Sequence, residues 1–191
     1  PWRRAGAEAI ERARPLEPTN ARRAKNVILF IGDGMGVTTI TAARIFDGQR
    51  RGATGEENQL SFETFPHLAL SKTYSVNAQV AESAATATAL LSGVKTDEEV
   101  IGLDARARPN EYASVAASRA ETLLETAERR GLATGIVTTT RFTHATPAAC
   151  YAHAPQRDWE DDSMPPADAR EVGFPDIARQ LVEFPHGDGI D

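Results

Sequence analysis

Three strand-like segments recur along this chain, at residues 26–31, 68–74 and 134–139. The first is a continuous hydrophobic run, which indicates a strand buried on both faces, as in a parallel sheet. Segments of helical periodicity lie between the strands, and this alternation predicts an α/β fold with a mainly parallel sheet. Ligands of such sheets bind beyond the carboxyl ends of the strands.

Four segments predict helices. A Gly-rich turn at 32–36 precedes a helical pattern, and a run of small residues begins at Ser83 and stops at Gly93. Residues 114–130 form the clearest amphipathic pattern and end at Gly131, a common helix cap. The last helix is expected within 175–184. Between them, we expect residues 47–58 to form a surface loop and residues 96–110 an exposed excursion.

The domain organisation follows from these segments. Residues 1–25, rich in Arg and Ala with prolines at 15 and 18, predict an N-terminal arm, and residues 26–191 predict part of one α/β domain. The chain begins with proline rather than methionine, as a processed or trimmed product would. It stops at a turn, 185–191, that leads toward a further strand, so we expect an incomplete domain.

Composition excludes several classes of protein. The chain has 191 residues and a formal net charge of −6, so we expect no nucleic-acid partner. No hydrophobic run approaches the roughly 20 residues that span a bilayer, so no transmembrane segment is predicted. The single cysteine, Cys150, excludes an intrachain disulfide and is expected to be a small buried residue.

A few polar residues at the expected carboxyl edge of the sheet could carry chemistry. Ser83 at a helix N-terminus suits anion binding, although on this stretch alone a simple helix cap is the more ordinary explanation. Asp33 between two glycines could bind a cation or stabilise its own turn. His144 and Thr146 could lie near a metal or only bond to backbone, and Arg157 could clamp a phosphate or be solvated.

Together these residues resemble the alkaline phosphatase family over roughly residues 25–185. Two motifs carry the resemblance, Asn26 to Gly36 and Glu82-Ser83-Ala84-Ala85-Thr86-Ala87-Thr88-Ala89. Further matches, in the family's order, are Gly93-Val94-Lys95, Val137-Thr138-Thr139-Thr140, His144-Ala145-Thr146-Pro147-Ala148, Tyr151-Ala152-His153 and Arg157-Asp158-Trp159. The resemblance implies a three-layer α/β sandwich, incomplete in this chain, that hydrolyses small phosphate monoesters.

The resemblance also implies a role for each matching residue. Ser83 matches the nucleophile that forms a phosphoseryl intermediate, at a site with two Zn2+ ions and one Mg2+ ion. Asp33 matches the carboxylate between one zinc and the magnesium, and Thr146 a hydroxyl ligand of the magnesium. His144 takes a position that varies between Asp and His in the family. Arg157 matches the arginine that binds phosphate.

Two departures from the family pattern matter. Glu82, which should orient Arg157, replaces the usual aspartate and is one methylene longer. The family's remaining metal ligands come from a longer C-terminal portion, so we expect this chain to be an N-terminal part that is inactive and unstable alone. A homodimer and a periplasmic or secreted location are expected by analogy. A phosphodiesterase, a sulfuryl-transfer relative and a non-catalytic phosphate-binding fragment remain open alternatives.

Overall fold

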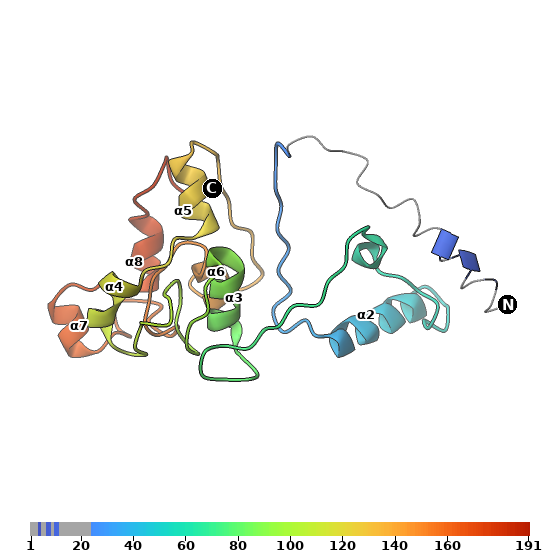
Figure 1. Cartoon of the computed structure of the whole chain (residues 1–191), viewed down its shortest axis with the longest axis horizontal. Helices are drawn as coiled ribbons and strands as arrows, with labels where there is room; N and C mark the ends of the chain where they lie inside the picture. The colour runs from blue at the N-terminus through green and yellow to red at the C-terminus, as the bar shows by residue number, and fades with distance from the viewer. Residues whose placement is uncertain (1–3, 5–6, 9, 12–23) are drawn as a thin grey trace. The chain divides into compact units, whose positions relative to one another are not determined.

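The computed structural model describes residue 4, residues 7–8 and 10–11, and residues 24–191. The chain divides into two compact units, Pro1–Ser71 and Lys72–Asp191 (Figure 1). The predicted arm lies largely outside the described residues. None of the helices in the described ranges has the length and apolar character needed to cross a bilayer.

Between residues 24 and 71, the first unit contains a long helix, α2 (Val37–Arg50), and a short 3-10 helix, η1 (Ser61–Thr64). Helix α2 confirms the helix predicted after the Gly-rich turn, in which Gly34 has a φ of 67°. Asn58 holds the following loop against α2, because its amide donates to the carbonyl of Arg44 at 2.8 Å and to Asp47 at 2.9 Å.

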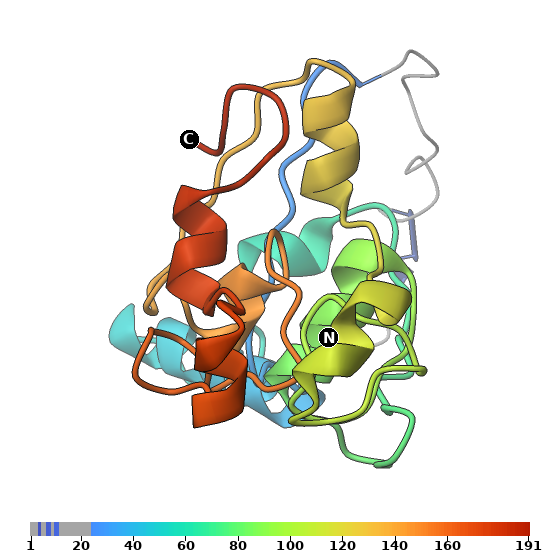
Figure 2. The same cartoon turned by 90° about the vertical axis from the view of Figure 1, so that its left-hand side faces the viewer.

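The second unit is a set of short helices joined by loops (Figure 2). They are α3 (Ser83–Ser92), η2 (Tyr112–Ser114), α4 (Val115–Ser118), α5 (Leu123–Arg129), α6 (Ala145–Ala148), α7 (Ala167–Glu171) and α8 (Ile177–Val182). Helix α3 contacts both α5 and α6. The helices predicted at Ser83 and within 175–184 are therefore confirmed.

Small side chains form the contact between α3 and α6. Ala84 and Ala87 of α3 and Ala145 and Ala148 of α6 are all buried in one hydrophobic cluster. Alanine lets two helix backbones approach closely, so short helices can still bury apolar area. Larger residues complete the cluster: Leu91, Ile101, Tyr151 and Ile177.

The segment 96–110 is part of the core rather than an exposed excursion. Val100, Ile101 and Leu103 are fully buried, and Val100 and Leu103 form a second cluster with Val115. Charged neighbours in the sequence suggested exposure, but the hydrophobic residues of this segment turn inward. The prediction for this segment was wrong.

The long helix predicted over 114–130 is broken in two. Helix α4 ends at Ser118, and α5 starts anew because Thr122 and Glu125 form a reciprocal capping box. Arg119 pairs with Leu103 in an isolated antiparallel bridge, which takes the intervening backbone out of helical geometry. The helical periodicity of the sequence did not reveal this interruption.

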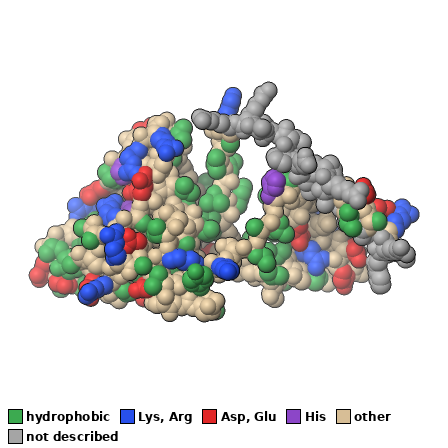
Figure 3. All heavy atoms as spheres, viewed as in Figure 1, with side chains coloured by type: hydrophobic (Ala, Val, Ile, Leu, Met, Phe, Trp, Pro, Cys, Tyr) green, Lys and Arg blue, Asp and Glu red, His purple; other side chains and the backbone are tan. Residues whose placement is uncertain are grey.

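The three strand-like segments are extended, but none is assigned as a strand. Strand pairing in the described residues amounts to two isolated bridges. Val27, Leu68 and Val137 are 87%, 95% and 102% exposed, and hydrophobic side chains lie at the surface of both units (Figure 3). The predicted burial on both faces was wrong here, because burial needs neighbouring layers that the described residues do not supply.

One backbone contact nevertheless has parallel geometry. Asp191 donates its N–H to the carbonyl of Thr134 at 2.9 Å, and its carbonyl accepts from Ile136 at 3.1 Å. These two partners flank Gly135, as they do when a residue pairs with a parallel neighbour. This contact with a single residue does not form a strand, and the predicted parallel sheet stays a prediction.

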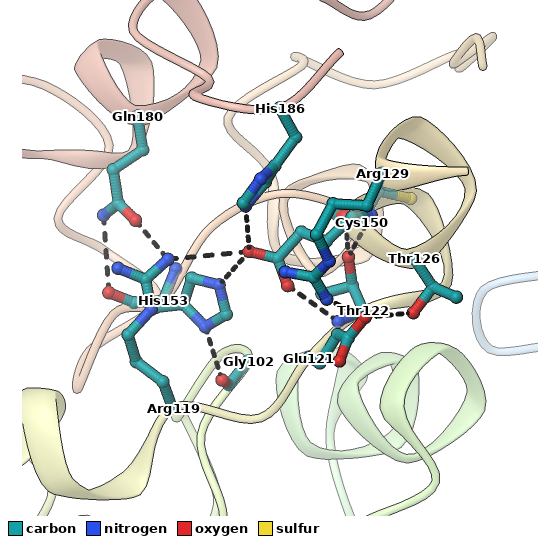
Figure 4. Close-up of polar contacts among 11 residues, drawn as sticks. Gly102, Arg119, Glu121, Thr122, Thr126, Arg129, Cys150, His153, Gln180 and His186 are labelled. Carbon is teal, nitrogen blue, oxygen red and sulfur yellow. Dashed lines mark hydrogen bonds and ion pairs between the residues drawn. The ribbon is translucent and has the colours of Figure 1, made fainter. Parts of the chain in front are cut away.

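A buried ionic network links α5 to the rest of the second unit (Figure 4). The imidazole of His153 contacts Glu125 at 2.9 Å through Nε2 and the carbonyl of Gly102 at 2.6 Å through Nδ1. Arg119 and His186 approach the same Glu125 oxygen at 3.5 and 3.4 Å. His153 thus has a polar partner at each ring nitrogen although its side chain is buried.

This network also explains the titration of Glu125. Burial raises the pKa of its carboxyl, but the hydrogen bonds from His153 and from the N–H of Thr122 outweigh burial. The pKa falls from 4.5 to about 2. The same helix cap contacts the only cysteine, since Thr122 donates to the carbonyl of Cys150 at 2.7 Å. Burial raises the pKa of the half-buried Cys150 thiol to about 11.

We expect the network to stabilise the protein at neutral pH and to fail in acid. A depressed folded-state pKa contributes stability above pH 4.5, which is lost as pH falls toward 2. The contribution is on the order of 2–3 kcal/mol. Glu125→Gln should lower the free energy of unfolding at pH 7, measured by urea titration, and the difference should shrink below pH 4.

The exposed Glu111, which faces Arg108 at 3.8 Å, provides the matched control. Glu111→Gln removes the same charge from a solvated position, where an ion pair contributes little. A pH-independent effect of Glu125→Gln, or an equal effect of Glu111→Gln, would contradict the assignment.

Candidate functional site

The site is built around the first turn of α3. Its N-cap is Glu82, whose carboxylate accepts from the N–H groups of Ala84 at 2.7 Å and Ala85 at 2.8 Å. Ser83 is therefore the first helical residue, and the interpretation of Ser83 as the cap was wrong. Gly93 ends the helix with a φ of 72°, as predicted.

The Glu82 carboxylate has two further donors from distant parts of the chain. The N–H of Glu99 lies 3.0 Å from Oε1, and Nη1 of Arg157 lies 2.5 Å from Oε2. The two ionic side chains are three-quarters buried, at 25% and 22% exposed. Burial raises the pKa of Glu82, but the three backbone N–H groups and Arg157 lower it overall.

Arg157 connects this carboxylate to α6. Its Nη2 lies 3.2 Å from Nε2 of His144, and Nδ1 of His144 accepts from the N–H of Thr146 at 3.4 Å, which caps α6. Ser83 follows Glu82 directly. Five of the six residues that the sequence singled out thus lie along one connected set of contacts or next to it in sequence.

Asp33, the sixth, belongs to the first unit. It lies in the turn that precedes α2, next to Gly34. The turn has the conformation expected from the glycines, with Met35 donating to the carbonyl of Gly32 at 3.3 Å. The role of Asp33 as a metal ligand stays a prediction.

The second unit supplies at most part of a metal site. Within the described part of the chain, no three side chains of His, Cys, Asp and Glu gather closely enough to hold an ion. A cation at Nε2 of His144 would also meet the positive guanidinium of Arg157, 3.2 Å away. Any ion at this site therefore needs further ligands.

Sequence reasoning missed two features near the site. Glu160 receives two hydrogen bonds from Arg141, at 2.8 and 2.6 Å, and one from Thr143. The hydrogen bond from Arg141 is the largest influence on Glu160, whose pKa falls to about 2. Gln156 is buried and bonded through its side-chain amide. Its place directly before Arg157 was the only available signal.

The sequence comparisons identify the family. Residues 24–188 match the profile described as alkaline phosphatase, and the chain belongs to that family. It is 50% identical over 182 residues to an alkaline phosphatase of Gadus morhua, covering 95% of this chain and 38% of the relative. The tissue-nonspecific isozyme of Gallus gallus is also 50% identical, covering 95% and 35%. The chain thus spans little more than a third of these relatives.

Solved structures agree with the assignment. Thermus thermophilus alkaline phosphatase superposes with a TM-score of 0.64 at 28% identity, over 91% of this chain and 31% of that one. The enzyme of the Antarctic bacterium TAB5 gives a TM-score of 0.53 at 30% identity, over 67% and 32%. The arrangement is therefore consistent with an alkaline-phosphatase-like fold.

Two changes at Glu82 should separate helix capping from ion pairing. Glu82→Asp keeps a carboxylate that can cap α3, whereas Glu82→Ala removes the cap and leaves Arg157 without its carboxylate. We expect Glu82→Ala to lower the free energy of unfolding by about 1–2 kcal/mol more than Glu82→Asp. Urea titration measures this, and equal losses would show that capping contributes little.

Proposed function

We propose that this chain carries the nucleophile and the phosphate-binding arginine of a phosphate monoesterase. The observation that carries the proposal is the ion pair between Glu82 and Arg157 at the start of α3, directly beside Ser83. Membership of the alkaline phosphatase family makes this combination of residues meaningful.

In the proposed reaction, Oγ of Ser83 attacks the phosphorus atom and the ester oxygen leaves as an alcohol. Water then attacks the phosphoseryl group, releases inorganic phosphate and restores the Ser83 hydroxyl. Arg157 binds phosphate oxygens and offsets the negative charge on them in the transition state. Its planar guanidinium has five N–H donors, so phosphate contacts need not displace Glu82.

The geometry changes one part of the sequence-based mechanism. The N–H groups of Ala84 and Ala85, which the helix N-terminus could offer to an anion, already bind the Glu82 carboxylate. The Glu82 carboxylate is thus the anion at the N-terminus of α3, where the sequence led us to expect phosphate. Phosphate recognition in this proposal depends chiefly on Arg157.

Metal ions complete the proposed site. Ser83, Thr146 and His144 of the second unit would contribute to holding two Zn2+ ions and one Mg2+ ion, together with further ligands. Asp33 of the first unit is proposed as a metal ligand on the family membership alone. When bound, the ions would favour the alkoxide of the serine and stabilise the leaving oxygen. A histidine-to-glutamate variant of the TAB5 enzyme, 30% identical with a TM-score of 0.54, carries magnesium in a metal site.

The remaining proposals concern the whole protein. The chain spans little more than a third of its relatives' length, and we propose that a C-terminal part of the protein covers the exposed hydrophobic side chains of Val27, Leu68 and Val137. We propose that this C-terminal part supplies the remaining ligands, that the protein is a homodimer, and that it works in the periplasm or outside the cell.

The nucleophile can be tested directly. Metal-replete protein of full natural length should hydrolyse p-nitrophenyl phosphate, and Ser83→Ala should lower kcat at least about a thousandfold. Brief incubation with 32P-labelled substrate followed by acid quenching should label the wild type and not Ser83→Ala. Faster turnover of bis(p-nitrophenyl) phosphate or p-nitrophenyl sulfate would favour the diesterase or sulfuryl-transfer alternative. If the protein hydrolysed none of these substrates but still bound inorganic phosphate, the non-catalytic phosphate-binding alternative would be favoured.

The length of Glu82 should matter for phosphate recognition. Glu82→Asp shortens the side chain that reaches Nη1 of Arg157 at 2.5 Å, so the guanidinium loses its present anchor. We expect the inhibition constant of inorganic phosphate to change by roughly three- to tenfold, while the melting temperature stays nearly constant. Identical inhibition constants for the two proteins would show that this contact does not set phosphate affinity.

A further inference from the structure

Two residues other than glycine have a left-handed backbone among the described residues. They are Glu99, with a φ of 67°, and Asn110, with a φ of 65°. A side chain with a Cβ makes this conformation unfavourable, more so for glutamate than for asparagine. Such residues persist where surrounding contacts hold them, often near functional sites.

Both side chains converge on the same buried amide. Nε2 of Gln156 donates to Oε2 of Glu99 at 2.8 Å and to Oδ1 of Asn110 at 3.2 Å. Oε1 of Gln156 accepts from the N–H of Asp158 at 3.2 Å, and Asn110 donates its own N–H to the carbonyl of Pro155 at 2.9 Å. Gln156 is only 9% exposed, so these partners replace the water that its amide would otherwise need.

These contacts form a closed ring that passes through Glu82 and Arg157 of the candidate site. Glu99 donates its N–H to Glu82 at 3.0 Å and accepts from Gln156 through its side chain. Gln156 is bonded covalently to Arg157, which returns to Glu82 at 2.5 Å. The antiparallel bridge between Ile101 and Ala154, with two 2.9 Å hydrogen bonds, fixes the spacing of the two segments.

We propose that Glu99 is a positioning residue for Arg157. Its side chain holds Gln156 and its N–H holds Glu82, so it fixes both the backbone that carries the guanidinium and the carboxylate that orients it. A turn that needed only a left-handed backbone would be served better by glycine, which adopts it without strain. The inference rests on the proposed role of Arg157 in binding phosphate.

Glycine at this position provides the decisive test, because it keeps the backbone and removes the side chain. In metal-replete protein of full natural length, Glu99→Gly should raise the inhibition constant of inorganic phosphate by roughly three- to tenfold. Its melting temperature should stay the same or rise, since the strain is relieved. Glu99→Gln, which keeps an acceptor for Gln156, should restore the constant to within about twofold of wild type.

Two further variants serve as controls. Glu98→Gln removes a neighbouring charge outside the ring and should leave phosphate inhibition unchanged. Asn110→Gly removes the longer contact to Gln156 and should weaken phosphate inhibition less than Glu99→Gly does. If Glu98→Gln and Glu99→Gln raised the inhibition constant of phosphate as much as Glu99→Gly, the cause would be long-range charge and not positioning. That result would overturn the proposal.

The outcomes separate this inference from the proposed function. Active wild-type protein whose phosphate inhibition is unchanged by Glu99→Gly would overturn the inference alone. A lower melting temperature of Glu99→Gly with unchanged phosphate inhibition would show a structural role and also overturn it. Wild-type protein that neither binds phosphate nor hydrolyses its esters would overturn the proposed function, and this inference with it.

Discussion

The carboxylate of Glu82 is the interaction on which the arrangement of the candidate site depends. A largely buried carboxylate is unfavourable unless donors replace its water, and four donors from three parts of the chain do so here. The start of α3, the turn at Glu99 and the side chain of Arg157 therefore share one partner. A displacement of any one of them changes the hydrogen bonds available to the other two.

Local signals in the sequence predicted local structure well. The small residues between Ser83 and Gly93 form α3, and the motif residues around it do lie near one another in the second unit. The ring through Glu99 and Gln156 was not predictable, because nothing in the sequence indicates that a glutamate adopts a left-handed backbone. The side chain of Glu99 contacts Gln156, which is 57 positions away along the chain.

Burial was harder to predict because it is not a local property. Val100 and Leu103 lie in a charged segment and are nevertheless buried, since α4 and Phe174 cover them. Val27 lies in an uninterrupted hydrophobic run and is nevertheless exposed. In both cases the pattern described the preference of the side chain correctly, whereas the neighbours available in this chain decided the outcome.

The position of Cys150 has a practical consequence for studying this protein. It is the only thiol in the chain, its pKa is raised to about 11, and it packs against the hydrophobic cluster of α3 and α6. A thiolate is scarce at neutral pH in such surroundings, so an alkylating reagent reacts chiefly when the packing opens. The rate of alkylation thus measures how often the packing between α3 and α6, which carry Ser83 and the cap His144, opens. No cysteine has to be introduced for this measurement.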